Sequence, residues 1–435
     1  MSLDRDLSQP QYSKAYLRYA LGLLVAVYTF NFIDRQILVI LQESIKKEMG
    51  LSDAQLGLLS GFSFAIFYAT LGIPIARLAD RGIRRNVIVA AITVWSVMTA
   101  LAGAARSYGQ LLAARIGVAI GEAGGSPPAH AIISDYFPPR ERGRALAIYS
   151  TGVYLGVLFG YLAGGWINQF FGWRAAFLIV GIPGLVVALL VRLTIREPRR
   201  GHSEGATRVE PAPPFRESVA LLWRLPSFRY LSLAVGFAAF VSYGTGNFGP
   251  SFLARTHHVP SGQIGTILGL LGGFGGMAGT YLGGWLGDRL GANDTRRYLW
   301  VPAVALVVMA PLRFVAYHVD DTRIAYALLG LTELLLLTYL APAIAVAHAL
   351  VPPSLRAFTS AILFFSLSVV GLGLGPPFTG FVSDLLAPRF GADSLRWALG
   401  FTSLASLPAA GFYLLAATRV RGDLPGARSP ATGSA

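Results

Sequence analysis

Long apolar runs, nearly free of charged residues, recur along the whole chain. A helix of about 20 apolar residues crosses the hydrocarbon core of a bilayer, so the pattern predicts membrane-spanning helices rather than buried strands. The predicted spans number twelve and cover residues 16–41, 54–76, 86–104, 110–135, 144–170, 174–194, 228–254, 262–286, 298–317, 323–350, 356–383 and 395–418. We therefore expect an all-α membrane protein with twelve transmembrane helices.

The composition supports this fold class and excludes several functions. Hydrophobic residues make up 54% of the 435 positions and charged residues only 13%, whereas a soluble domain has about 25% charged residues. The absence of cysteine excludes thiolate metal sites and cysteine nucleophiles. Lysine occurs only at positions 14, 46 and 47, which excludes a phosphate-binding P-loop. The net charge of +14 is spread over short patches, so we expect no nucleic acid partner.

The distribution of basic residues predicts the orientation in the membrane. Placing both termini on one side assigns 25 of the 36 Lys and Arg residues to that compartment and eight to the other, with three inside spans. By the positive-inside rule the termini are cytoplasmic. We expect a multi-pass protein of the plasma (inner) membrane, and a monomer.

A basic, Pro- and Gly-containing block divides the chain between its sixth and seventh spans. The predicted units are a six-helix bundle over 1–195, a cytoplasmic linker over 196–227, a second bundle over 228–419 and a disordered tail over 420–435. Within the linker, the apolar spacing of residues 215–225 predicts a short interfacial helix.

The two halves repeat each other. Leu78-Ala79-Asp80-Arg81 after the second span matches Leu286-Gly287-Asp288-Arg289 after the eighth, at an offset of 208 residues. Phe137-Pro138-Pro139 matches Val351-Pro352-Pro353 at an offset of 214. A duplicated twelve-span chain is the architecture of transporters that bind their substrate near the middle of the membrane, between two pseudo-symmetric bundles.

Two sets of motifs carry a family resemblance. Ala76 to Arg81, followed by Arg84-Arg85, resembles the signature loop of the major facilitator superfamily, with Ala76 where glycine is usual. Asn31 to Arg35 and Arg115 to Ala123 resemble the corresponding segments of the spinster lipid transporters, and the chain looks like a bacterial member. The resemblance implies that Asp34 and Glu122 are proton-coupling acids and that Arg115 tunes them.

The charges inside the first and fourth spans are the main candidates for chemistry. Asp34 lies about 24 Å along the helix from Arg18, at membrane depth. A charge there costs roughly 2.5 to 3.5 kcal/mol and needs a partner or a wet cavity. Either Asp34 forms a structural ion pair with Arg115, or desolvation lets it exchange a proton. Arg35 points about 100° away on the helix, which favours a structural or gate contact.

Arg115 and Glu122 share one face of the fourth span. They are seven residues apart, so their backbones are separated by about 10.5 Å and they cannot easily pair with each other. Asp34 on a neighbouring helix suits Arg115, which would leave Glu122 free to titrate.

The remaining candidates belong to the substrate cavity and to a cytoplasmic gate. Glu333 in the tenth span either contacts a cationic headgroup or pairs with Arg313, and Asn31, Arg35 and Asn247 complete the cavity candidates. Gate candidates are the charged residues at cytoplasmic helix ends, whose alternative role is topology signalling alone: Asp80, Arg81, Arg84, Arg85, Asp288 and Arg289.

Glycines at every fourth position mark close helix contacts. They occupy 152, 156, 160 and 164 in the fifth span and 275, 279, 283 and 287 in the eighth. The pattern indicates static packing first, and the matching ladders also suit two bundles that rock against each other.

Together these observations predict a proton-coupled secondary transporter that moves an amphipathic lipid, a lysophospholipid or sphingoid-type molecule, by alternating access. The alternative is a multidrug or organic-acid exporter of the same fold. We expect no enzymatic activity, no metal and no cofactor, with H⁺ as the coupling ion. An intramembrane enzyme would need a nucleophile and base whose spacing is not present.

Overall fold

The computed structural model describes residues 12–199 and 214–424, except for the side chains of Ile73, Ala76 and Asp80. Within this part of the chain all regular structure is helical. The structure is helical over most of every predicted span. By length and apolarity alone, seven segments of the described chain qualify as membrane spans, or eight when the bent pair α8–α9 counts as one. Two of them, 56 and 71 residues long, are long enough to cross twice.

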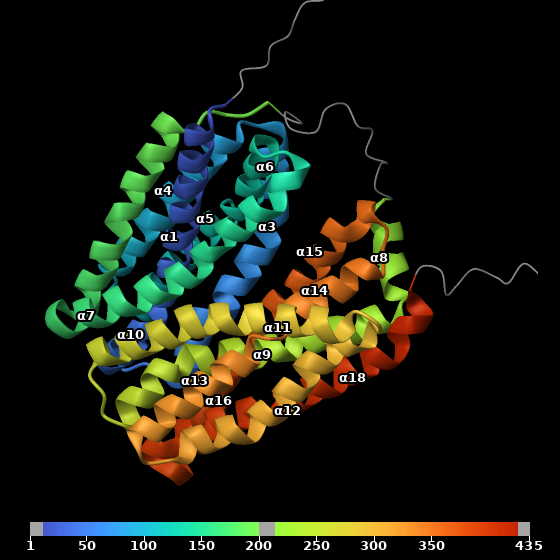
Figure 1. Cartoon of the computed structure of the whole chain (residues 1–435). Helices are drawn as coiled ribbons and strands as arrows, with labels where there is room; N and C mark the ends of the chain where they lie inside the picture. The colour runs from blue at the N-terminus through green and yellow to red at the C-terminus, as the bar shows by residue number, and fades with distance from the viewer. Residues whose placement is uncertain (1–11, 200–213, 425–435) are drawn as a thin grey trace, which may run out of the picture.

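The first half of the chain forms one bundle, coloured blue to green in Figure 1. Its helices are α1 (Lys14–Met49), α2 (Asp53–Gly57), α3 (Ser63–Arg81), α4 (Arg84–Ala102), α5 (Tyr108–Glu122), α6 (Ser126–Tyr136) and α7 (Pro139–Thr194). A π-helical turn, η1 (Leu58–Phe62), joins α2 to α3. The continuous α7 covers the fifth and sixth spans, which separate at Gly172, where the chain has a φ of 80°. This conformation is open mainly to glycine.

The second half forms the other bundle, coloured yellow to red. It begins after the short helix α8 (Phe215–Trp223), which lies where the interfacial helix was predicted. Its helices are α9 (Pro226–Thr256), α10 (Ser261–Leu270), α11 (Gly276–Gly291), α12 (Arg296–His318), α13 (Thr322–Leu336), α14 (Leu340–Ala349), α15 (Arg356–Ser366), α16 (Gly373–Phe390), α17 (Ser394–Leu404) and α18 (Ser406–Asp423). Two further π turns, η2 (Leu271–Gly275) and η4 (Leu367–Leu372), interrupt the eighth and eleventh spans.

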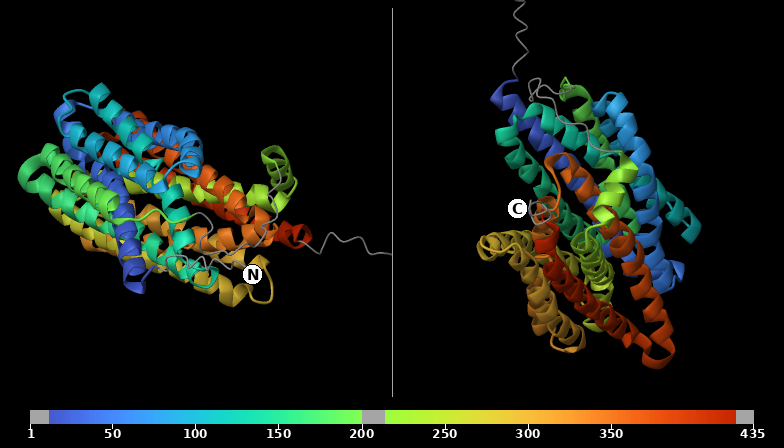
Figure 2. Two further views of the ribbon diagram at one scale, coloured as in Figure 1. Left: turned by 90° about the horizontal axis from the view of Figure 1, so that it is seen from above. Right: turned by 90° about the vertical axis from the view of Figure 1, so that its right-hand side faces the viewer.

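The hydrophobic cores explain how the two bundles are joined. One buried cluster contains residues of both halves, among them Leu41 of α1, Leu56 of α2, and Phe252 of α9. The other two clusters are each centred on one half. The shared core lies at the end opposite the two termini, where α7 runs beside α10 (Figure 2). From there the bundles diverge toward the ends that carry the termini (Figure 1).

The C-terminal end differs from the prediction. We expected a disordered tail from residue 420, but α18 continues to Asp423. The Asp423 carboxylate accepts hydrogen bonds from the Ser227 main-chain N–H (2.9 Å) and hydroxyl (2.7 Å), which ties the last turn to the start of α9. Residues 425–435, and 200–213 of the predicted linker, lie outside the described chain.

Candidate functional site

Four charged side chains meet inside the first bundle. Asp34 and Arg35 lie on α1, and Arg115 and Glu122 lie on α5. Asp34, Arg115 and Glu122 are buried, with 2%, 6% and 1% of their surfaces exposed. A cluster of two acids and two arginines is neutral overall when all four are ionised, which reduces the cost of holding charges at this depth.

The ion pair in this cluster joins Arg35 to Glu122. The Arg35 Nε donates to the Glu122 carboxylate at 2.6 Å. The sequence analysis gave an Asp34–Arg115 ion pair as one alternative and expected Glu122 to be free to titrate. In the structure Glu122 pairs with Arg35, and Arg115 binds the Asp34 main chain. The 100° rotation between Asp34 and Arg35 on α1 is the reason, because it turns Arg35 toward α5. The pair uses the Arg35 Nε and one oxygen of the Glu122 carboxylate.

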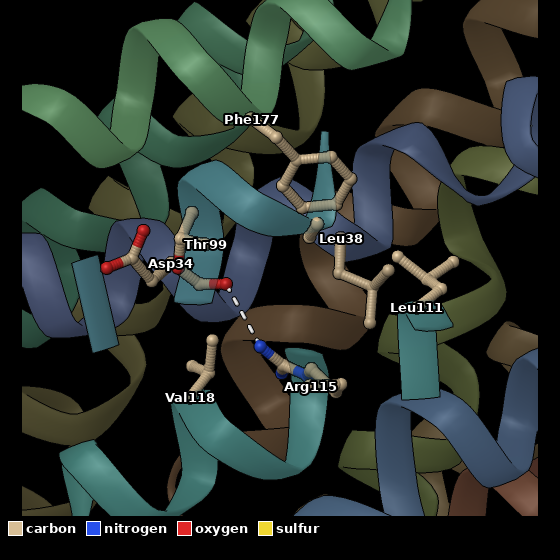
Figure 3. A pocket seen from close by; sticks show the side chains of 8 residues that line it. Asp34, Leu38, Thr99, Leu111, Arg115, Val118 and Phe177 are labelled. Carbon is tan, nitrogen blue, oxygen red and sulfur yellow. Dashed lines mark hydrogen bonds between the residues drawn. The ribbon is translucent and has the colours of Figure 1, made fainter. Parts of the chain in front are cut away.

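Arg115 binds the backbone of Asp34 instead of its carboxylate. Its Nη1 donates to the Asp34 main-chain oxygen at 3.2 Å, as the dashed line in Figure 3 shows. Within the described residues, the Asp34 Oδ1, the Glu122 Oε1 and the Arg115 Nε have no hydrogen-bond partner in the protein. Buried polar atoms are seldom left unpaired, and the exceptions concentrate at functional sites.

Aromatic rings on α3 hold both guanidinium groups. The Phe64 ring centroid lies 4.8 Å from the Arg35 guanidinium carbon and 4.7 Å from that of Arg115. Tyr68 contacts Arg35 at 5.0 Å. A cation over an aromatic face is stabilised by about 0.5 to 2 kcal/mol, more where water is excluded. The rings place the two cations without neutralising them, so the charges stay available to carboxylates.

The fourth span is interrupted directly after Glu122. We predicted one helix over 110–135, but α5 ends at Glu122 and α6 starts at Ser126. The sequence signal was present, because Gly124-Gly125 before a Pro-Pro pair favours a turn and a new helix start. Broken helices at membrane depth occur where the backbone faces protein or a cavity. The break places Glu122 at a helix end inside the bundle.

A partly buried ion pair lies in the second bundle. Arg313 on α12 donates from Nη2 to the Glu333 carboxylate on α13 at 3.0 Å, and from Nε to the Tyr317 hydroxyl at 3.3 Å. Arg313 is 4% exposed, whereas the Glu333 side chain keeps 23% of its surface exposed. Of the two alternatives for Glu333, the structure shows the pair with Arg313, and a contact of Glu333 with a headgroup stays a prediction.

The two asparagine candidates differ in their surroundings. The Asn247 amide donates to the Tyr243 main-chain oxygen at 2.8 Å, one turn back on α9, so it serves its own helix. Asn31 on α1 is 3% exposed and its Oδ1 has no protein partner among the described residues. Asn31 lies in the same part of the bundle as Glu122, with which its side chain interacts.

Two tyrosines lie near charged groups of the two bundles. Tyr243 of α9 packs against core residues of both halves and interacts electrostatically with Arg35. Tyr339 lies within electrostatic range of Tyr243 and Glu333. Phenol rings offer both an apolar face and a hydrogen-bonding tip.

A second charged cluster joins the bundles at the end away from the termini. We call it the junction cluster, and it consists of Glu43, Lys46, Asp53, Arg255 and Asp384. Arg255 donates two hydrogen bonds of 2.8 Å to the Asp53 carboxylate and one of 2.7 Å to Glu43. Lys46 adds a 2.6 Å bond to Asp53. This bidentate geometry is the strong form of an arginine–carboxylate pair, and it links α9 of one bundle to α1 and α2 of the other.

The junction cluster also contains a helix cap that crosses between bundles. The two carboxylate oxygens of Asp384 on α16 accept from the main-chain N–H groups of Asp53 (3.0 Å) and Ala54 (2.8 Å), which open α2. A carboxylate at a helix N-terminus satisfies free donors and complements the helix dipole. Sequence analysis missed this cluster, because its residues look like ordinary loop and helix-end charges.

The predicted gate residues lie at the termini end and contact their own bundles. Arg84 pairs with Glu197 at 2.8 Å and with Asp135, and the Arg85 main-chain N–H donates to Glu197. In the second bundle Asp288 accepts from Tyr298, and Arg289 lies over the Trp285 ring. Arg81 is exposed, and the side chain of Asp80 lies outside the described part. Their gating role stays a prediction.

The glycine ladders pack inside each bundle. A Cβ on Gly156 would lie less than 3.0 Å from Phe32 and Thr29 of α1, and one on Gly283 would meet Thr338, which follows α13. Static packing is therefore the role shown. The glycines at which the two bundles touch are others: a Cβ on Gly165, Gly265 or Gly380 would lie less than 3.0 Å from backbone atoms of the opposite bundle.

A cavity of about 340 Å³ lies beside the junction cluster, between the two bundles. Its lining includes Glu43, Ser44 and Lys47 from α1, Asn168 from α7 and His258 from the loop after α9. The Asn168 amide donates to the Ser44 hydroxyl at 2.9 Å, so these polar groups are partly satisfied by one another.

Comparisons with known proteins agree with this architecture. The chain matches the model of the Major Facilitator Superfamily over residues 24–365. It is 37% identical to an "MFS-type efflux pump" of Mycolicibacterium smegmatis over 411 residues, which are 93% of this chain and 94% of that protein. "Protein spinster homolog 1" of Xenopus tropicalis is 27% identical over 430 residues, 92% of this chain and 80% of that one.

The structure is also similar to solved structures. A crystal structure of a bacterial homolog to the human lysosomal transporter Spinster, in an inward-facing and unoccupied conformation, superimposes with a TM-score of 0.87 at 35% identity. The match covers 97% of this chain and 100% of that one. The occupied form of that homolog, also inward-facing, gives a TM-score of 0.84.

Proposed function

The chain belongs to the major facilitator superfamily and is a spinster-like transporter, and on this premise we propose that it couples movement of an amphipathic lipid to a proton gradient. The lipid class we propose is a lysophospholipid or a sphingoid-type molecule. The carrying observation is the buried Arg35–Glu122 pair beside an Asp34 carboxylate that has an unpaired oxygen.

The proposed coupling step is a change of partner by Arg35. When Glu122 gains a proton, it loses its charge, and the attraction that holds the 2.6 Å pair falls. Arg35, whose side chain is 16% exposed, is then available to an anionic group. Asp34 is next to it on α1 and its protonation state sets the net charge of the cluster. Proton binding and anion binding are thereby linked through one guanidinium group.

The substrate features follow from both bundles. Arg35 is suited to a phosphate, and the exposed part of Glu333 is suited to an ammonium group. Tyr243 lies within electrostatic range of Arg35 and Tyr339 within that of Glu333, and we propose that their phenol groups accept the glycerol or sphingoid backbone. A zwitterionic headgroup would therefore bridge the bundles, with its acyl chain against apolar side chains.

The arrangement supports an inward-facing state. We propose that the protein resides in the inner membrane with cytoplasmic termini, as the arginine distribution predicts. The junction cluster then lies on the outer side and closes it, while the bundles diverge toward the cytoplasm (Figure 1). The similar bacterial structure is named as inward-facing, in agreement with this proposal.

The test uses purified protein in liposomes with an imposed pH gradient. Asp34→Asn and Glu122→Gln each remove a titrating group with little change of shape. We expect both variants to retain exchange of labelled lysolipid for unlabelled lysolipid and to lose accumulation driven by the gradient. Glu141→Gln, at an exposed position of α7, is the matched control. Full gradient-driven accumulation by both acid variants would exclude the proposed coupling.

A drug or organic-acid exporter is the second candidate, favoured by the similarity to an efflux pump. Competition separates the two. If the transporter carries lipids, lysophosphatidylcholine inhibits uptake of labelled lysolipid at low concentration and neither cationic drugs nor uronic acids do so. The opposite ranking would favour the exporter.

A further inference from the structure

A small cavity lies next to the proposed proton-binding cluster, inside the first bundle. Its volume is about 10 Å³, and Figure 3 shows its lining. Four helices contribute to it: α1, α4, α5 and α7. The polar lining residues are Asp34, Thr99 and Arg115, and the apolar ones are Leu38, Ala102, Leu111, Val118 and Phe177.

Three polar atoms of this lining have no partner in the described protein. They are the Asp34 Oδ1, the Thr99 Oγ1 and the Arg115 Nε. Their residues are buried, with exposures of 2%, 2% and 6%. Leaving a buried donor or acceptor unsatisfied costs about 1 to 3 kcal/mol each. Three such atoms around one cavity therefore indicate a missing hydrogen-bonding partner rather than three independent defects.

We propose that this cavity binds one water molecule, held by the Asp34 carboxylate, the Thr99 hydroxyl and the Arg115 guanidinium group. A volume of about 10 Å³ corresponds to roughly one water-sized probe, and a buried water needs two to four polar partners. The apolar remainder of the lining leaves no room for a larger ligand. A metal cation is disfavoured because Arg115 brings a fixed positive charge to the site.

The three partners occupy three of the four hydrogen-bonding positions of water. The Arg115 Nε is only a donor, so it binds the water oxygen. The water then donates one hydrogen to the ionised Asp34 carboxylate and the other to the Thr99 oxygen. When Asp34 is protonated, its O–H donates to the water. The Thr99 hydroxyl can donate or accept, so it adapts to both states of Asp34.

Thr99 is therefore a positioning residue for Asp34 in the proton-coupled transport proposed above, on which this inference rests. It acts through the water and through the direct interaction of its side chain with the Asp34 carboxyl. The charged groups that face Asp34 are Arg115 and Glu122 from α5, while α4 presents Thr99 and α7 presents the apolar Phe177. Its neighbour Arg35 on α1 is directed to Glu122. At the other end of α1, α9 contributes Arg255 to the junction cluster. Asp34 and Arg115 are charged, so Thr99 is the polar lining residue that can be substituted without changing a charge.

The experiment compares Thr99→Val, which removes the hydroxyl at nearly constant volume, with Thr99→Ser, which retains it. Thr93→Val is the matched control, because it lies on the same helix and its hydroxyl binds its own backbone at 2.8 Å. Two measurements are made in liposomes: the pH profile of lysolipid transport, and infrared difference spectra in H₂¹⁶O and H₂¹⁸O. Asp34→Asn identifies the Asp34 carboxyl band.

We expect a water O–H band that shifts in H₂¹⁸O and that disappears in Thr99→Val. Loss of the water removes a hydrogen bond to the ionised acid, so the pH midpoint of transport rises by about one unit in Thr99→Val. Thr99→Ser and Thr93→Val should retain the wild-type midpoint and band.

The outcomes separate this inference from the proposed function. If Asp34→Asn retains gradient-driven accumulation, proton coupling through Asp34 is wrong, whatever Thr99 does. If Asp34→Asn loses it while Thr99→Val keeps the wild-type midpoint and the H₂¹⁸O-sensitive band, the function stands and the water site is overturned. An Asp34 band with no H₂¹⁸O-sensitive partner in the wild type overturns it as well.

Discussion

The junction cluster gives the sharpest prediction about the conformational balance. Arg255→Gln removes two hydrogen bonds to Asp53 and one to Glu43. The Arg255 side chain is 15% exposed and that of Asp53 is 3% exposed. Once the bundles separate at this end, water reaches both residues. The substitution therefore destabilises the state that is closed at the junction and leaves the other state nearly unchanged.

The magnitude follows from the loss of one partner of a buried ion pair. Such a loss costs about 3 to 5 kcal/mol. The lower value applies here, because Lys46 still compensates Asp53. A change of about 3 kcal/mol shifts the ratio of the two states about 150-fold, which would make the state that is open at the junction readily detectable.

The chain contains no cysteine, so spin labels can be attached without background. Labels at Arg106→Cys and Arg323→Cys occupy exposed positions near the junction end, one in each bundle. Double electron–electron resonance should show a new population at longer distance in Arg255→Gln. An exchanged pair, Asp53→Arg with Arg255→Asp, should partly restore the short distance.

Arg174→Gln is the matched control. Arg174 pairs with Glu48 at the same end of the molecule, but both residues belong to the first bundle. Its loss should leave the label distances unchanged. Identical distance distributions for wild type and Arg255→Gln would refute the reasoning, because they would show that the cluster does not hold the junction closed.

Three further predictions concern packing, capping and substrate contact. Gly265→Ala places a Cβ less than 3.0 Å from the Tyr161 carbonyl oxygen of the opposite bundle. This overpacking costs about 1 to 3 kcal/mol and should lengthen the distances between the same spin labels. Gly246→Ala, whose Cβ would have no atom within 4 Å, should leave them unchanged. Hydrogen bonds from the Ile324 and Arg323 main-chain N–H groups lower the pKa of Asp321 from its ordinary value of 3.8. The helix cap made by Asp321 is therefore fully stabilising above pH 3.8 and is lost as the pH falls through the lowered pKa. The difference in Tm between wild type and Asp321→Ala should shrink over that pH range. A difference in Tm that stays constant would contradict this prediction. Glu333→Gln should raise the KM for a zwitterionic lysolipid about tenfold and leave that for an anionic lipid without an ammonium group unchanged.

Hydropathy predicted the membrane-spanning architecture because each span depends on local composition. The interruptions inside spans were harder to predict. Gly124-Gly125 before two prolines signalled the break after Glu122, but apolar composition alone gave one continuous helix. The π turns η1 and η4 lack a Gly-Gly or Pro-Pro pair, so the sequence gives no comparable signal there.

The site residues were predictable as a set, and their pairing was not. A charge at membrane depth is visible in the sequence, which identified Asp34, Arg115 and Glu122. Which acid meets which arginine depends on the rotation of α1 against α5, and the structure pairs Glu122 with Arg35. A similar limit applies to the glycine ladders. A four-residue period indicates that another helix packs closely, but it does not identify that helix.

The junction cluster shows a third limit. Asp53 and Arg255 are 202 positions apart, and each looks like an ordinary charge at a span end. Their contact exists only when the two bundles dock, so no local pattern reveals it. The same holds for Asp384, whose carboxylate caps a helix of the opposite bundle.

The π turn η1 separates two tasks of the second span. On one side of it, Asp53 and Gly57 contact the opposite bundle, and on the other side Phe64 and Tyr68 hold the guanidinium groups. A π turn contains one residue more than an α turn and so resets the angular phase of the helix. Deleting Ser60 would rotate one set of side chains by about 100° relative to the other. That single additional residue lets the α2 side of the span face the opposite bundle while the α3 side faces the arginines of α1 and α5.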